Sequence, residues 1–330
     1  VLLAILSPFA GGPSAAGGEW SIEEVGRFFF EDGSIRELSG ISWVSTDESG
    51  MRYYCVSDDK PVLIPLRVTL DGETGAITSA AAGEPVPLIE TAADLEGIGF
   101  DSRSGRVLIS NETEPGIREY DVASGDLLRR VDTTMHPELG VFQNIVQNKA
   151  WESLAIAPGG SFLWTANEDS LAGDPAGTIR LQRFDADLKP AGQWAYELAA
   201  APQEWVTRFA LGVPDLLALP DGTLVVLERG FGTTRTGFRA RIQLYRVDQA
   251  EATDLSTAPL EGATRVAKTL LWENNFDDLN ANFEGITLGP TLTGGGRSIL
   301  LVADNGGTST RHSLLLLRLK PKPVPAPTAA

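Results

Sequence analysis

The sequence predicts an all-β fold, a β-propeller built from four-stranded blades, and two observations lead to this prediction. First, one pattern recurs: an apolar strand that begins at an acidic or polar residue, a turn that is usually rich in glycine, and a second strand that ends in acids or amides. The residues that open these copies, 56 to 69 positions apart, are Ser39, Glu96, Glu152, roughly Asp215, and Glu284. Second, each copy is a small antiparallel sheet that cannot bury both of its faces alone, so the copies must stack and close into a ring.

The strand count of each repeat supports ring closure. The first repeat covers residues 38–59, and four strands are expected in each of the next three repeats. In the second repeat they lie at 96–100, 106–112, 116–122 and 127–133, and in the third at 152–157, 161–168, 178–185 and 193–198. In the fourth repeat they lie at 215–219, 223–230, 241–248 and 266–273. The fifth repeat has only three, at 283–289, 298–305 and 312–319, while the segment 20–30 is left over. We therefore expect 20–30 to pair with 313–319 and close a ring of five blades. Six blades are the alternative, if 190–213 or 247–283 contains another.

The composition fits a single exported domain. The net charge is −17, and no run of Lys and Arg is long enough to follow a phosphate backbone, so nucleic acid is not an expected partner. Residues 1–18 are expected to be the remnant of a signal peptide, because their apolar stretch is too short to span a membrane and is followed by small residues. The expected location is therefore the periplasm or the exterior. We also expect a monomer. A natural hydrophobic tail is the alternative to the signal peptide. Residues 19–320 are expected to form the propeller, 321–330 a Pro-rich disordered tail, and Cys55 a buried apolar side chain.

The repeat also predicts where its acids lie. In an up-and-down blade, the innermost strand begins at the same edge where the second strand ends, so these ends converge on one mouth of the central channel. Carboxylates so close raise one another's pKa unless a cation or hydrogen-bond donors compensate them. The predicted metal ligands are Glu96, Asn111, Glu152, Asn167, Glu284, Asp304 and Asn305. Oxygen ligands favour Ca²⁺, with Mg²⁺ or Mn²⁺ as alternatives, and the scarcity of His and Cys argues against zinc. The competing interpretation is that these acids cap backbone N–H groups.

These segments carry a family resemblance. The series "LEGIGFD…NE", "WESLAIAPGG…NED", "LLALPDGTLVVLERG" and "NFEGITLGP…LLVADN" resembles the phytase-like domain family, named for an esterase-like activity of phytase, from about residue 38 to residue 319. The resemblance implies an exported bacterial or plant protein with a propeller-type fold and a phosphoester or ester hydrolase activity. Ser39 departs from the pattern, because other repeats place Glu there, and the first blade is expected to be a weaker ligand donor.

If the protein is an enzyme, its residues favour metal-assisted hydrolysis of a small anionic phosphoester. Glu112 and Glu168 are the candidate bases, with further metal ligation as their alternative role. Arg229 is the candidate contact for the phosphate, and its alternative is a salt bridge to Glu228 or to a carboxylate of the ring. His312 is a candidate acid–base group, with a solvated loop side chain as the alternative. No G-x-S-x-G segment occurs, which disfavours a serine esterase.

A second function class stays open. The propeller could instead be a non-enzymatic periplasmic or extracellular binding module whose mouth holds a structural cation. The long segments 133–148 and 230–239 would then form its recognition surface. Fold alone does not decide between the two classes.

Overall fold

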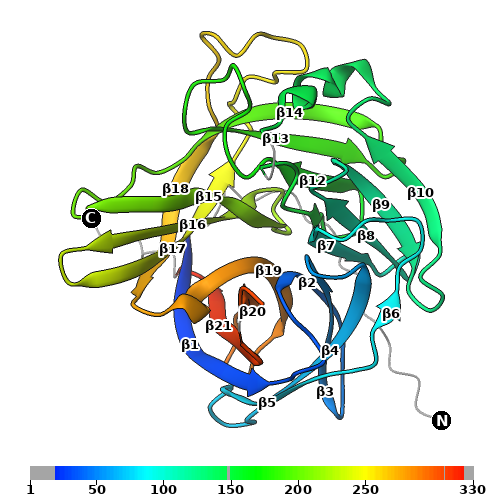
Figure 1. Cartoon of the computed structure of the whole chain (residues 1–330), viewed down its shortest axis with the longest axis vertical. Helices are drawn as coiled ribbons and strands as arrows, with labels where there is room; N and C mark the ends of the chain where they lie inside the picture. Colours follow the sequence, from blue (N-terminus) through cyan, green and yellow to red (C-terminus); the bar gives the residue numbers. More distant parts are fainter. Residues whose placement is uncertain (1–18, 147–148, 308, 323–330) are drawn as a thin grey trace, which may run out of the picture.

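Five four-stranded antiparallel sheets surround a central channel in the computed structural model, which describes residues 19–146, 149–307 and 309–322 (Figure 1). From the channel outward, blade 1 contains β2 (Leu38–Asp47), β3 (Gly50–Ser57), β4 (Val62–Leu70) and β5 (Ile77–Ala82), and blade 2 contains β7 (Leu95–Asp101), β8 (Arg106–Asn111), β9 (Gly116–Asp121) and β10 (Leu127–Asp132). Blade 3 contains β11 (Ala155–Ile156), β12 (Phe162–Ala166), β13 (Thr178–Asp185) and β14 (Pro190–Glu197), and blade 4 contains β15 (Thr207–Ala218), β16 (Leu224–Thr234), β17 (Gly237–Asp248) and β18 (Ala267–Phe276). Blade 5 contains β19 (Asn282–Thr291), β20 (Arg297–Asp304), β21 (Arg311–Pro321) and the N-terminal strand β1 (Trp20–Glu31). The short strand β6 (Val86–Pro87) pairs with β4, and two 3₁₀ helices, η1 (Pro137–Asn144) and η2 (Leu279–Ala281), lie outside the sheets. The predicted β-propeller is confirmed.

The ring closes through the N-terminal strand. β1 pairs antiparallel with β21 from Trp20 opposite Pro321 to Glu31 opposite Arg311, with one irregularity next to Gly26. In Figure 1 the blue β1 therefore lies beside the red β21, although almost the whole chain separates them. The segments 190–213 and 247–283 supply β14, β18 and the first half of β15 rather than another blade. The prediction of five blades is confirmed, and the six-blade alternative is wrong.

The apolar core is divided among the blade interfaces. Five clusters of buried side chains lie between neighbouring blades, one at each interface of the ring. For example, Leu217 and Ile242 of blade 4 pack with Phe283 and Leu315 of blade 5. Cys55 is fully buried in the cluster between blades 1 and 5, as the sequence predicts. Because each blade buries both faces against its neighbours, the ring is stable only when it is closed.

The inner strands come very close together at the channel. A Cβ atom on Gly285 would lie 2.8 Å from the carbonyl oxygen of Ser39 and 2.9 Å from the backbone nitrogen of Ile41, so no larger residue fits there without a shift. Asp215 links three blades, because its carboxylate accepts hydrogen bonds from the backbone N–H groups of Leu154 at 3.1 Å and Ile286 at 2.8 Å. Burial raises the pKa of Asp215 to about 8, although these backbone donors act in the opposite direction. In the fourth repeat the acid therefore links the inner ends of blades 3, 4 and 5 through hydrogen bonds.

The expected terminal segments fall largely outside the described residues. The signal-peptide remnant at 1–18 lies entirely outside them, as does the tail beyond Lys322. The first residue assigned to that tail, Pro321, is instead the last residue of β21. No helix in the described part of the chain is long and apolar enough to cross a membrane.

Substitution at the centre of the ring tests its close packing. We expect Gly285→Ala to lower the free energy of unfolding by about 1–3 kcal/mol, because the added methyl group overlaps the backbone of β2. Gly26→Ala is the matched control: nothing lies within 4 Å of its added Cβ, so a change of at most about 0.5 kcal/mol is expected. Urea denaturation measures both variants. Equal effects would show that the inner strands are free to move apart.

Candidate functional site

Carboxylates from several blades gather at the mouth where the inner strands begin. Oxygen atoms of Asp94, Glu96 and Glu112 all lie within 4.8 Å of one another. Glu96 and Glu152 are each only 8% exposed. Asp94 takes a left-handed backbone conformation, with φ of 76°, which is uncommon for a residue other than glycine and is enriched at functional sites. The predicted convergence of Glu96, Glu112 and Glu152 at one mouth is therefore present in the structure.

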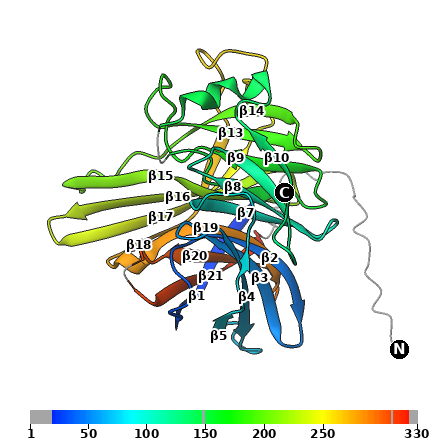
Figure 2. The same cartoon turned by 45° about the vertical axis from the view of Figure 1, so that its right-hand side comes forward.

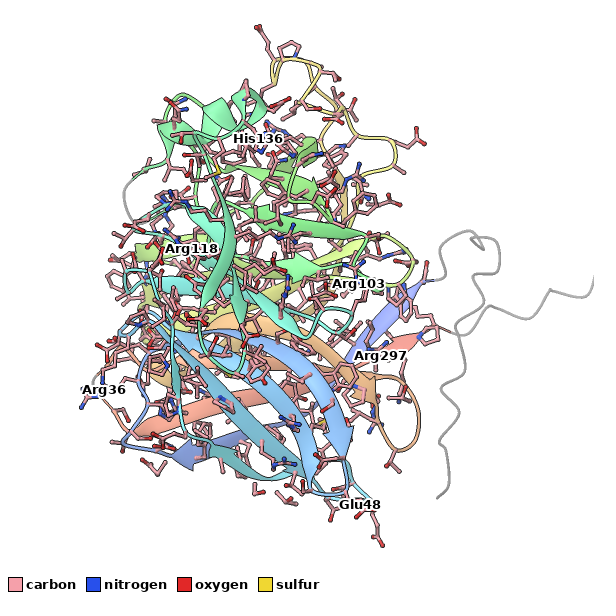
Figure 3. The ribbon with its side chains drawn as sticks, turned by 90° about the vertical axis from the view of Figure 1, so that its right-hand side faces the viewer. Arg36, Glu48, Arg103, Arg118, His136 and Arg297 are labelled. Carbon is pink, nitrogen blue, oxygen red and sulfur yellow. The ribbon has the colours of Figure 1, made fainter. Side chains whose placement is uncertain are left out.

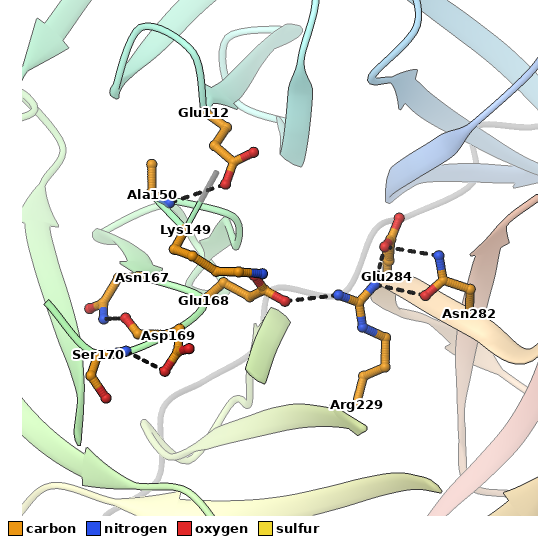
Figure 4. A network of polar contacts seen from close by, with 10 residues as sticks. All are labelled: Glu112, Lys149, Ala150, Asn167, Glu168, Asp169, Ser170, Arg229, Asn282 and Glu284. Atoms are coloured by element: carbon orange, nitrogen blue, oxygen red, sulfur yellow. Dashed lines mark hydrogen bonds and ion pairs between the residues drawn. The ribbon is translucent and has the colours of Figure 1, made fainter. Parts of the chain in front are cut away.

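One half of the mouth is compensated by cations, and we call it the compensated half. Arg229, on β16, lies 2.8 Å from Glu168 through Nη2, and its Nη1 bonds both Glu284 and, at 2.7 Å, Asn282 (Figure 4). Lys149 forms a second ion pair with Glu168. These contacts bring together the ends of blades 3, 4 and 5. The salt bridge of Arg229 to ring carboxylates, which the sequence left open, is thus formed.

The salt bridge to Glu228, offered as the other possible partner of Arg229, is not formed. Glu228 instead pairs with Lys268 at 2.8 Å and accepts the hydroxyl of Tyr196, on the outer side of blade 4. Arg229 is 7% exposed, and its Nη atoms are already committed to three partners. Arg229 is therefore a buried side chain that links the carboxylates of Glu168 and Glu284.

The other half, which we call the uncompensated half, consists of Asp94, Glu96, Glu112 and Glu152. None of them forms an ion pair with a Lys or Arg among the described residues. Burial, together with neighbouring carboxylates, raises the pKa of both Glu96 and Glu152 well above the ordinary value. Glu96 also accepts no hydrogen bond within the described chain, so its ionised form has no partner among these residues.

Glu112 and Glu152 of this half act on each other's pKa. Their interaction raises the pKa of Glu152 and lowers that of Glu112. Glu112 also accepts the backbone N–H of Ala150 at 3.2 Å (Figure 4). Burial nevertheless leaves the pKa of Glu112 above its ordinary value.

The predicted amide ligands bind backbone groups at the strand ends. Asn111 donates to the carbonyl of Ala93 at 2.9 Å and accepts the N–H of Glu114 at 2.6 Å. Asn167 likewise accepts the N–H of Arg180 at 2.9 Å. Both amides therefore cap backbone groups, which is the alternative to metal ligation that the sequence left open.

The remaining predicted ligands and His312 lie at blade 5. Asp304 accepts the N–H of Gly306 at 2.7 Å and the amide of Asn282 at 2.8 Å, while Asn305 accepts the N–H of Glu37 at 3.1 Å. The solvated interpretation of His312 is wrong, because the side chain is fully buried, with its ring 5.0 Å from that of Phe30. Its Nε2 lies 3.2 Å from the carbonyl oxygen of Asp32, and burial lowers its pKa. None of its contacts is with the carboxylates of the uncompensated half.

Three residues of the mouth, Asp94, Asn282 and Lys149, were missed at the sequence level. Asp94 lies two positions before Glu96, and the corresponding position in the fifth repeat, Asn282, also contacts the mouth. Comparing this position across the repeats would have found both. Lys149 carried no such signal, because it lies in an irregular loop and meets Glu168 only through the folding of that loop.

The pH dependence of stability tests the electrostatics of the mouth. Burial raises the pKa of Glu284 to about 7. Asp58 lies near Glu284 and Asp304 at the same mouth, and burial together with these carboxylates raises its pKa to about 8, so between pH 4 and pH 8 the folded protein holds more protons than the unfolded chain. We therefore expect the free energy of unfolding of metal-free protein to fall as pH rises through this window, by on the order of 3 kcal/mol for Glu284 alone. Urea titrations in EDTA measure it. Glu96→Gln should raise stability at pH 8, whereas Glu48→Gln, at an exposed hairpin, should not. A pH-independent stability would contradict this account.

The solved structures that the chain resembles are distant. One of them is Kuenenia stuttgartiensis hydrazine synthase, with 11% identity and a TM-score of 0.39. The match covers 80% of this chain and 64% of the hydrazine synthase chain, slightly under two thirds of the latter's length. The PQQ-bound aldose sugar dehydrogenase of Streptomyces coelicolor (12% identity, TM-score 0.42) is matched over 93% of this chain and 100% of that chain. Myxococcus xanthus glutaminyl cyclase (11% identity, TM-score 0.42) is matched over 92% and 100%. Similarity at this level says nothing about the chemistry of this chain.

A family model gives the clearer assignment. No curated protein matches the chain. The model described as "Phytase-like: Esterase-like activity of phytase" matches residues 36–307, from just before β2 to the loop after β20, a range that contains every residue of both halves of the mouth. The match covers most of the chain. The protein therefore belongs to the phytase-like family.

Proposed function

We propose that this protein is a Ca²⁺-dependent hydrolase of small phosphoesters, with its cation bound in the uncompensated half of the mouth. The observation that carries the proposal is the convergence of oxygen atoms of Asp94, Glu96 and Glu112 within 4.8 Å, around a Glu96 that is 8% exposed and has no partner among the described residues. An isolated buried carboxylate is costly unless it is paired or binds a metal. A divalent cation meets this requirement directly.

The donor set supports a hard cation. All the candidate ligands are carboxylates, and Ca²⁺ binds six to eight oxygen atoms at 2.3–2.6 Å in flexible geometries. Three side chains leave positions for water and for substrate oxygen atoms. Mg²⁺ and Mn²⁺ are alternatives that take the same ligand type. Burial and the neighbouring carboxylates raise the pKa of Glu152, so we expect this part of the mouth to release a proton when the cation binds.

A bound cation would neutralise phosphate oxygens and orient the attacking water. Glu112 is the candidate base, because it lies in the carboxylate cluster and burial raises its pKa above the ordinary value, which makes its carboxylate a stronger base. Lys149 is a better candidate than Arg229 for the anion contact, since its side chain is 35% exposed whereas that of Arg229 is 8% exposed. Glu168 is held by both cations, so we assign it and Arg229 to the scaffold of the mouth.

The second candidate function is a binding module with a structural cation. The burial of Glu96 and Glu152 favours it, because a deeply buried ion has little room for substrate. Export to the periplasm or the exterior, which the family resemblance suggests, fits either function and remains part of the proposal.

Paired calorimetry and hydrolysis assays test the proposal. We expect Glu96→Gln to weaken Ca²⁺ binding at least roughly tenfold, because even the loss of a group that only supports a metal ligand has about this effect, and Glu96 is proposed as a direct ligand. Hydrolysis of p-nitrophenyl phosphate should fall in parallel. Glu48→Gln, on the exposed hairpin between β2 and β3 (Figure 3), is the matched control and should behave as the parent does. Ca²⁺ binding without hydrolysis of p-nitrophenyl phosphate, bis-p-nitrophenyl phosphate or phytate would leave the structural cation as the better account. Unchanged Ca²⁺ affinity in Glu96→Gln would overturn the site itself.

The two basic residues can be separated by kinetics. Lys149→Gln should raise KM for the phosphoester several-fold while Ca²⁺ affinity stays as in the parent, because only the anion contact is lost. Arg229→Lys should instead lower stability, since a lysine cannot reproduce the fork that joins Glu168 and Glu284. If Arg229→Lys changes KM alone, the arginine contacts substrate and the assignment of the two residues is reversed.

A further inference from the structure

Blade 4 carries a basic extension in an acidic protein. We call residues 205–212 and 230–241 the arm; they belong to the long strands β15, β16 and β17, which project from the ring in Figures 1 and 2. The arm contains four arginines and no Asp or Glu, although the whole chain carries a net charge of −17. Its arginines are Arg208, Arg235, Arg239 and Arg241. None of the four forms an ion pair with any described residue.

An aromatic ring lies flat on the arm. A Cβ atom on Gly232 would be 2.5 Å from the ring of Trp205, and one on Gly230 would be 3.0 Å from it. Glycine at these two positions of β16 therefore lets the indole lie directly on the strand. The guanidinium of Arg241 lies 5.7 Å from the same ring. Trp205 is only partly buried, so the ring forms a fixed platform at the surface.

A cavity of about 700 Å³ opens beside this platform. Side chains that line it include Gln203, Trp205, Thr234, Arg235, Arg239 and Asn275. Arg239 donates to the carbonyl of Phe238 at 2.6 Å and to the hydroxyl of Thr236 at 3.1 Å, both of them neutral. Glu204 also lines the cavity, but it pairs with neither arginine. The cavity thus combines an aromatic face, amide and hydroxyl groups, and two arginines without a carboxylate partner in the described chain.

We propose that this cavity is a binding site for a sugar that carries an acidic group, either a phosphate or a carboxylate. The flat face of Trp205 suits the apolar face of a sugar ring, and the amides and hydroxyls suit its hydroxyl groups. Arg235 and Arg239 supply the planar donor forks that bind phosphate and carboxylate groups. The site is separate from the acidic mouth and does not depend on the chemistry proposed there.

Calorimetry in EDTA tests the site while the mouth lacks a cation. We expect the parent protein to bind glucose 6-phosphate or glucuronate at least tenfold more tightly than glucose, because only the acidic sugars engage the arginines. The double variant Arg235→Gln/Arg239→Gln should lose roughly 10- to 100-fold in affinity for the acidic sugar. Arg52→Gln, an exposed arginine of blade 1, is the matched control, and Glu96→Gln locates binding away from the mouth; both should bind as the parent does.

The ligand series also identifies the acidic group. A preference for glucose 6-phosphate assigns the site to phosphate, and a preference for glucuronate assigns it to a carboxylate. Equal affinity for inorganic phosphate and glucose 6-phosphate would remove the sugar from the proposal. Failure of both acidic sugars to bind the parent, or unchanged binding in the double variant, would overturn it.

Discussion

The close approach of the five inner strands at the channel is the constraint on which the rest of the structure depends. It requires a small residue after the acid, as at Gly285, and it places equivalent positions of different blades side by side. A residue repeated in the sequence is thereby concentrated in space. Asp215 shows the structural use of this geometry, because its carboxylate ties backbone groups of blades 3 and 5 to blade 4. Glu96 shows the opposite case, an acid at the same edge with no partner in the described chain.

Charge is distributed unevenly around this edge. Arg229 and Lys149 neutralise Glu168 and Glu284, and the ion pairs are largely buried, so solvent screens them little. The opposite half has no Lys or Arg partner among the described residues, and the pKa values of Glu96, Glu112 and Glu152 are all raised by burial and by neighbouring carboxylates. Such a half-compensated cluster is stable either protonated or with a cation, and near neutral pH these two states compete. The proposed cation would meet the electrostatic requirement of this edge of the fold.

The sequence favoured five blades over six and predicted the strands of blades 2 to 5 and the closing strand, because repeat spacing and the unpaired segment 20–30 constrain topology directly. The outer strands of blade 1, β4 and β5, were not predicted. The sequence also placed Glu96, Glu112 and Glu152 together. The partner of Arg229 was left open, since a choice between Glu228 and a ring carboxylate depends on which face of β16 each side chain takes. The burial of His312 against Phe30 was missed because the predicted pairing of the two chain ends stopped at residue 313, whereas the observed pairing continues to His312 opposite Phe30. Asp94 reaches the site through an unusual backbone conformation.

Anomalous diffraction from crystals soaked in Mn²⁺, which takes the same oxygen ligands as Ca²⁺, tests the central claim most directly. The account predicts a peak bonded to Asp94, Glu96 and Glu112, with Arg229 still joined to Glu168 and Glu284. A peak beside Glu284 and Asp304 instead, or no ordered ion at the mouth at saturating Mn²⁺, would contradict it.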